Sequence, residues 1–184
     1  MKTLDRPKAR PRQQEIPDPQ IRDVADQFEL ARQLLFAQPP GAGVLCPLMN
    51  TAAVAIELYL KCLSAEKVYV DAGLGWSRVS ATPEFGHGLA TLLDKVKVDL
   101  RDELDRAFLA ELPSLGRLSF QAALEQCEGA FETSRYPFEP NHALSKCPLL
   151  LLMGCSYFLQ QFVAKLRTRE TTQWSDQEPF HARS

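Results

Sequence analysis

The sequence predicts an all-α protein, an antiparallel bundle of about five to six helices with a long loop after the second helix. Apolar residues recur at spacings of three and four through the body of the chain and almost never alternate. Prolines and glycines divide this pattern into segments of helical length. The 184 residues, 45% of them hydrophobic and 24% charged, are enough for one domain with its own core.

Asp18 and Pro19 mark the start of the first predicted helix, which covers about residues 19–37. Aspartate caps helices, and proline suits the first helical position, where a backbone N–H has no partner. The Pro-Pro-Gly sequence at 39–41 ends the helix. Apolar residues at steps of three and four form its predicted core stripe: Ile21, Val24, Phe28, Ala31 and Leu35.

The second predicted helix covers about residues 46–69 and has a broad apolar face. One polar line crosses it, because Asn50, Glu57 and Lys61 follow one another at steps of seven and four. This spacing places the three side chains on one side of the helix.

Residues 70–86 contain three glycines and are predicted as the long loop. The short β-like run at 67–70 is too isolated to build a sheet. Further helices are predicted to begin near residue 87 and to cover about 99–112, 119–133 and 144–169.

The bundle is predicted to span residues 18–169, between a disordered basic arm at 1–17 and a flexible tail at 170–184. The arm lacks the apolar stretch of a secretory signal. Five cysteines, an odd number without a C-x-x-C pair, indicate a reduced, cytoplasmic protein. Polar residues interrupt the apolar stretch at 147–166, which favours a buried or interface helix over a membrane span.

Signatures of the common enzyme classes are absent from the sequence. The three histidines, His87, His142 and His181, form no pair with metal-ligand spacing, so neither a metal nor a cofactor is predicted. Neither a phosphate-binding glycine loop nor a G-x-S-x-G motif occurs. The net charge of −2 argues against a protein whose whole surface grips nucleic acid, while a local basic patch is compatible with it.

Three segments of the chain resemble HEPN-domain proteins, and they occur in that family's order. Residues 50–63, NTAAVAIELYLKCL, resemble the second helix of that family. Residues 86–93, GHGLATLL, resemble its G-H-D-L-x-x-L segment. Residues 130–139, AFETSRYPFE, resemble its R-Y-x-Y-E segment. Phe138 stands where the family more often has tyrosine. The resemblance implies a dimeric helical bundle that associates with RNA or nucleotides in toxin–antitoxin, antiviral or stress systems.

On this resemblance we expect the chain to bind RNA or a nucleotide within a regulatory or defence module. Phosphate contacts are expected from Lys61 and Arg135, and base stacking from Tyr136. A homodimer is expected, with a cognate antitoxin or a nucleotidyltransferase-like protein as a further partner and without membrane association. The candidate pocket residues, expected to converge on one side of the bundle, are Asn50, Glu57, Lys61, His87, Arg135 and Tyr136.

A second interpretation is a metal-independent ribonuclease, because many HEPN proteins carry an R-x4-6-H motif and six residues separate Arg135 from His142. Arg135 would stabilise the phosphorane charge, and His142 would act as general acid or base. Pro137 and Pro140 lie between them and oppose a shared helical face, so the sequence predicts no cleavage through this pair. A third interpretation is a non-catalytic bundle whose apolar last helix forms a dimer or binds a partner protein.

Overall fold

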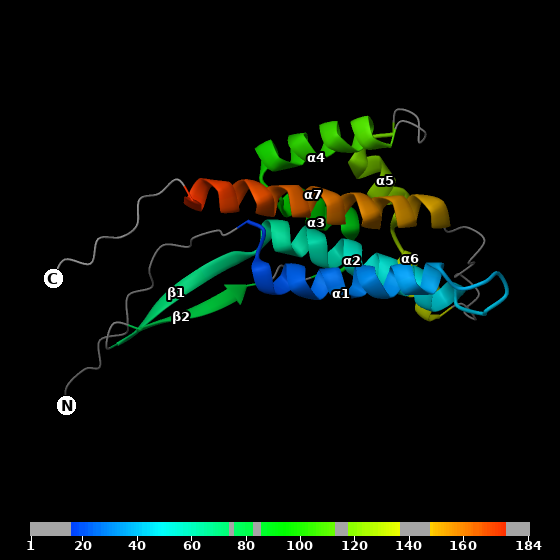
Figure 1. Cartoon of the computed structure of the whole chain (residues 1–184), viewed down its shortest axis with the longest axis horizontal. Coiled ribbons are helices and arrows are strands. Elements are labelled where there is room, and N and C mark those ends of the chain that lie inside the picture. Colours follow the sequence, from blue (N-terminus) through cyan, green and yellow to red (C-terminus); the bar gives the residue numbers. More distant parts are fainter. Residues whose placement is uncertain (1–15, 74–75, 83–85, 113–117, 137–147, 176–184) are drawn as a thin grey trace.

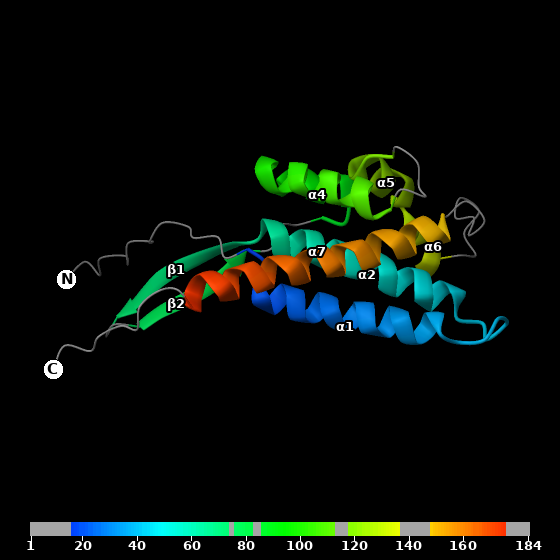
Figure 2. The same cartoon turned by 45° about the horizontal axis from the view of Figure 1, so that its top comes forward.

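The computed structural model describes residues 16–73, 76–82, 86–112, 118–136 and 148–175. These residues form a helical bundle, as predicted, to which a β-hairpin is added. The hairpin projects beyond one end of the helices (Figures 1 and 2). In chain order the elements are α1 (Pro19–Phe36), α2 (Leu45–Ser64), β1 (Glu66–Gly73), β2 (Trp76–Thr82), α3 (Leu89–Lys95), α4 (Val98–Glu111), α5 (Phe120–Cys127), α6 (Ala130–Arg135) and α7 (Leu149–Ser175).

Helix α2 is the central element of the bundle. It packs on α1, α3, α6 and α7. Both views show α1, α2 and α7 running side by side, with α4 and α1 on opposite sides of α7 (Figures 1 and 2). Twelve of the twenty residues of α2 are buried, which explains why its apolar face is so broad.

Three phenylalanines join α4 and α5 to α7. The ring centroids of Phe108, Phe120 and Phe158 lie 5.1 to 5.2 Å from one another, in tilted or edge-on arrangements. All three side chains are fully buried. Aromatic pairs in this geometry add about 0.5–1.5 kcal/mol each beyond their buried area, so this cluster fixes the side of the bundle that carries α4.

The predicted long loop at 70–86 is wrong over most of its length, because a hairpin occupies residues 66–82. Strands β1 and β2 pair antiparallel, with Glu66 opposite Thr82 and Tyr69 opposite Val79. An antiparallel hairpin needs no distant partner strand, so the β-like run finds its partner a few residues further along the chain. Helix α2 therefore ends at Ser64, where the chain enters β1, rather than near residue 69.

The predicted core stripe of the first helix is right in part. Ile21, Phe28 and Leu35 pack against the core, whereas Val24 is 42% exposed. The fully buried residues of α1 are Ala25, Glu29 and Arg32, which the stripe did not include. The reason is an internal ion pair: apolar periodicity assigns charged residues to the solvent side, and here a charged pair faces the core. Asp18 caps the helix as predicted.

The predicted helix at 119–133 is two helices, α5 and α6, which Glu128 and Gly129 separate. Gly129 has a φ of 77°, in the left-handed region that glycine reaches without strain. Helix α7 continues to Ser175 and so includes the first positions of the predicted tail at 170–184. At the other end, Ile16 of the predicted arm packs against the core.

Helices α2 and α7 are both long and apolar enough to cross a membrane, and about half of each is buried within the bundle. The outer side of α7 also carries large apolar side chains. Leu150 is 78% exposed and Tyr157 is 51% exposed, whereas Leu151 and Met153 are buried in the core. The apolar run that begins α7 therefore serves the core on one side and remains accessible on the other.

Candidate functional site

One carboxylate holds two of the other predicted site residues. Glu57 and Lys61 lie one turn apart on α2, and Nζ of Lys61 is 2.7 Å from Oε1 of Glu57. His87 lies in the segment before α3, and its Nδ1 is 3.0 Å from Oε2 and 3.1 Å from Oε1 of the same carboxylate. Glu57 thus links an ammonium group and an imidazole from two separate parts of the chain.

Phe131 extends this cluster to Arg135. The rings of His87 and Phe131 stack with centroids 5.6 Å apart and planes 8° apart. The guanidinium carbon of Arg135 lies 4.9 Å from the centre of the Phe131 ring and 5.9 Å from that of Tyr136. Both distances are typical of cation–π contacts. We refer to the connected set as the His87 face: Glu57, Lys61, His87, Phe131, Arg135 and Tyr136.

Backbone contacts fix the His87 segment beside α6. The Glu128 carboxylate accepts hydrogen bonds from the backbone N–H groups of Leu89 and Ala90, at 3.1 and 3.4 Å. These N–H groups belong to the first turn of α3 and have no partner within the helix. Gly88 permits the approach, because a Cβ there would lie 3.1 Å from the Glu128 carboxylate. His87 lies two residues before the start of α3, and these bonds therefore hold it next to α6.

Burial divides the His87 face into an inner and an outer part. The side chains of Glu57 and Lys61 are only 10% and 13% exposed. The side chain of His87 is 70% exposed, and Arg135 and Tyr136 also lie at the surface. The inner part therefore fixes the carboxylate, while the imidazole, the guanidinium group and the tyrosine ring of the outer part lie at the surface.

Two predicted site residues stand apart from this cluster. Asn50 lies on α2 two turns before Glu57, about 10 Å along the helix axis. It is half-buried, and its side chain makes no hydrogen bond within the described ranges of the chain. His142 lies outside the described residues, so the structure does not place the Arg135–His142 pair.

Two residues that position this cluster were missed by the sequence analysis. Phe131 falls within the apolar pattern of the predicted helix at 119–133 and so reads as a core residue. Its spacing of four from Arg135 was the available signal, because residues four apart share one side of a helix. Glu128 gave no signal, since its contact with Leu89 spans 39 residues.

A second polar cluster lies buried between α1 and α7. Arg32 donates to both carboxylate oxygens of Glu29 at 2.8 and 2.6 Å, and Ser156 donates to the same carboxylate at 2.5 Å. Glu29 and Ser156 are fully buried. Because internal donors satisfy both carboxylate oxygens, this cluster joins two helices and leaves no group for a ligand.

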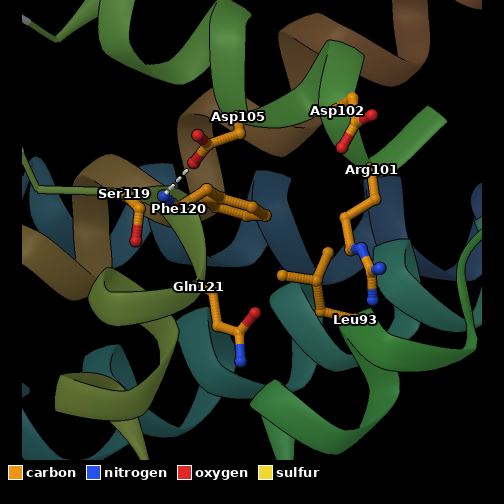
Figure 3. Close-up of a pocket in the computed structure, with 7 residues that line it drawn as sticks. All are labelled: Leu93, Arg101, Asp102, Asp105, Ser119, Phe120 and Gln121. Carbon is orange, nitrogen blue, oxygen red and sulfur yellow. Dashed lines mark hydrogen bonds between the residues drawn. The ribbon is translucent and has the colours of Figure 1, made fainter. Parts of the chain in front are cut away.

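Three cavities among the described residues lie away from the His87 face. One of about 200 Å³ lies between α3, α4 and α5, and Figure 3 shows Asp105 at its edge accepting a hydrogen bond from the backbone N–H of Phe120 at 2.7 Å. Two apolar cavities of about 560 and 570 Å³ share Leu149 as a lining residue. No residue of the His87 face lines any of these three cavities.

No family model, curated protein or solved structure matches the chain. Within the described residues, no group of three His, Cys, Asp or Glu side chains is placed to hold a metal ion. Function is therefore inferred from the geometry of the His87 face and from the resemblance of its three segments to HEPN-domain proteins.

Proposed function

We propose that the His87 face binds single-stranded RNA. The observation that carries this proposal is the stack of exposed groups on Phe131, with the imidazole of His87 5.6 Å and the guanidinium of Arg135 4.9 Å from the ring centre. Single-stranded nucleic acids are bound by cations that contact phosphate and by flat side chains on which bases stack. Arg135 supplies the first kind of group, and His87 and Tyr136 supply the second.

The openness of the face favours a polymer over a free nucleotide. Pockets for small ligands enclose most of the ligand surface. The outer groups of the His87 face are exposed, with the side chain of His87 70% accessible and Arg135 and Tyr136 at the surface. A strand of RNA gains its affinity from several shallow contacts along its length and does not require enclosure.

The resemblance to HEPN-domain proteins supports the same proposal. The segment at 50–63 supplies the two α2 residues of the face, that at 86–93 supplies His87, and that at 130–139 supplies the α6 residues. The three segments that carry the resemblance therefore meet at one surface. As that resemblance implies, we place the protein in a cytoplasmic regulatory or defence module with a cognate antitoxin or nucleotidyltransferase-like partner.

Fluorescence anisotropy with a short single-stranded RNA tests the proposal. We expect Arg135→Ala to weaken binding about tenfold, because it removes a phosphate contact and a stacking surface. The slope of log affinity against log salt concentration should fall by about 0.7, the contribution of one phosphate contact on a single strand. Arg106→Ala is the matched control, since Arg106 is an exposed arginine on α4 that bonds to its own helix backbone.

Three results would contradict the proposal. These are no binding by the wild-type protein, equal effects of the two arginine substitutions, and a salt slope that Arg135→Ala leaves unchanged. If a free mononucleotide binds more tightly than the RNA, the ligand of this face is a nucleotide and not RNA.

A second candidate function, a dimerisation or partner-binding module, is favoured by the outer side of α7. Leu150 and Tyr157 lie seven residues apart and therefore share one helix side, where they are 78% and 51% exposed. We expect light scattering to show a wild-type dimer and a Leu150→Lys monomer. Leu109→Lys is the control, because Leu109 is an apolar residue on α4 that is 38% exposed. A wild-type monomer, or a dimer that survives Leu150→Lys, excludes this interface.

A further inference from the structure

The β-hairpin has an outer edge along each of its strands. Within the described residues, β1 and β2 form a sheet with each other alone, and each strand packs chiefly on the other one. The hairpin projects beyond the helices, so its edges are not covered by the bundle (Figures 1 and 2). A two-stranded hairpin is at best marginally stable in water, whereas a sheet of three or more strands is stable. The hairpin would therefore gain stability from a further strand.

The sequence of β1 is complementary to its own copy. An antiparallel pair centred on Tyr69 places Lys67 opposite the partner's Asp71. The two-fold symmetry of such a pair also places Asp71 opposite the partner's Lys67. Val68 then lies opposite the partner's Val70, and Tyr69 lies opposite its own copy. Each charged residue between 67 and 71 thus meets the opposite charge, and each apolar residue meets an apolar one.

This complementarity is specific to one register. In an antiparallel ladder, hydrogen-bonded and non-hydrogen-bonded pairs alternate, so a shift of the centre by one residue moves every partner by two. A centre at Val68 places Lys67 opposite Tyr69, and a centre at Val70 places Asp71 opposite Tyr69. Only the centre at Tyr69 matches both charges. The pairing of β1 with β2 is regular from 66 to 71, so the five residues of the match lie in regular strand.

The hairpin itself supplies no opposite charge directly across from these two positions. Its register places Ala81 opposite Lys67 and Ser77 opposite Asp71. The other strand also offers no comparable edge, because Arg78 is the one charged residue between 76 and 82. A pair of β2 strands therefore cannot bring opposite charges together. Charge complementarity thus selects the β1 edge, and it selects a second copy of this chain as the strand that pairs there.

We propose that β1 pairs with β1 of a second copy of this chain, centred on Tyr69, so that two hairpins form one four-stranded antiparallel sheet. Main-chain hydrogen bonds along the edge supply affinity in strand addition of this kind. The opposed charges of Lys67 and Asp71 fix the register, since like charges directly opposite one another are destabilising. The inference goes beyond RNA binding at the His87 face and does not depend on it.

This interface differs from the outer side of α7. The hairpin projects from the end of the bundle opposite to the start of α7, where Leu150 lies (Figure 1). The two surfaces make separable predictions. A dimer formed through β1 survives Leu150→Lys, whereas a dimer formed through α7 does not.

Native mass spectrometry of the full-length chain and its charge-reversal variants tests the proposal. Lys67→Asp and Asp71→Lys each replace two opposite-charge pairs by two like-charge pairs. We expect each variant to weaken the dimer by about tenfold or more. Arg78→Asp is the matched control, because it reverses a positive charge on β2 and should leave the dimer unchanged.

Mixing the two single variants is the decisive measurement. The Lys67→Asp chain and the Asp71→Lys chain face each other with opposite charges at both positions. We therefore expect a heterodimer of about wild-type affinity, although neither variant dimerises well with itself. The double variant Lys67→Asp/Asp71→Lys should form a homodimer again. A loss of folding cannot produce this pattern, and circular dichroism of each variant checks that the fold is intact.

Four outcomes overturn the inference, and RNA binding at the His87 face stands in all of them. The first is a wild-type chain that remains a monomer at its highest soluble concentration. The second is a dimer that Lys67→Asp leaves as strong as before. The third is a mixture of the two folded single variants without a heterodimer. The fourth is a dimer lost in Leu150→Lys and kept in Lys67→Asp, which assigns self-association to α7.

Discussion

Among single residues, Glu29 and Arg32 show how the bundle accommodates buried charge. Their two hydrogen bonds of 2.8 and 2.6 Å form a bidentate pair, and Ser156 of α7 donates to the same carboxylate. A buried charge is costly unless a partner and further hydrogen bonds compensate it. Here all partners come from α1 and α7, so the pair fixes how these two helices meet.

We expect Arg32→Met to destabilise the protein by about 3–5 kcal/mol, because it leaves the Glu29 carboxylate buried without its counter-charge. Urea unfolding followed by circular dichroism measures this change. Arg106→Met on the surface of α4 should change the free energy of unfolding by less than about 0.5 kcal/mol. Equal unfolding midpoints for the two variants would show that the buried Glu29 carboxylate does not need the charge of Arg32 for stability.

Burial also separates the cysteines by reactivity. Cys62, Cys127 and Cys155 are at most 1% exposed, whereas Cys46 is half-buried. Burial raises the pKa of Cys62, and a hydrogen bond to Cys127 together with burial raises the pKa of Cys155, so thiolate is scarce at both. In a Cys147→Ser variant we expect Cys46 alone to react fast with a thiol reagent, and the other three only after unfolding. A second fast-reacting thiol in native buffer would contradict this burial.

For the site residues, the sequence predicted contacts between near neighbours on one helix but not contacts between distant segments. The step of four between Glu57 and Lys61 predicts their pairing, and a 2.7 Å hydrogen bond joins them. The bond from Glu57 to His87 spans 30 residues, and no local pattern encodes it. Helical periodicity could not group Glu57 with His87. The resemblance to HEPN-domain proteins did, because its segments place both residues in one ordered set.

Among secondary-structure elements, the helices with plain apolar periodicity were predicted well. The helix predicted at 99–112 is α4, Val98–Glu111, in which Leu104 and Phe108 are the buried residues. Two boundaries failed for tertiary reasons. Glu128 is held at the start of α3 and so ends α5, and β1 is stable only through its pairing with β2.

Gly129 marks the first of these boundaries, and its backbone conformation allows a test. We expect Gly129→Ala to lower the free energy of unfolding by about 1–2 kcal/mol, because its φ of 77° strains any L residue while its Cβ would meet open space. Gly154→Ala is the control of opposite sign. Gly154 is helical, its Cβ would make an ordinary contact at 3.7 Å, and the substitution should be neutral or stabilising. Thermal unfolding of the two variants measures both effects, and an unchanged Gly129→Ala would mean that the turn into α6 is not strained.

For the whole molecule, the central position of α2 explains why distant segments meet at one surface. α2 packs on both α3 and α6, so the segment before α3 and the end of α6 lie beside Glu57 and Lys61. The chain carries a net charge of −2, so any RNA affinity must come from a local arrangement of cations and rings and not from overall charge. The His87 face offers such an arrangement, with Arg135 beside the rings of Phe131 and Tyr136.

The most direct test of that claim is an NMR titration of the wild-type protein with a short single-stranded RNA. We expect the largest shifts at the imidazole of His87, the side-chain N–H of Arg135 and the ring of Tyr136, with smaller shifts at the backbone of residues 86–90. Shifts that gather instead on α4, or at the exposed side of α7 around Leu150, would contradict the proposed face, as would a spectrum that excess RNA leaves unchanged.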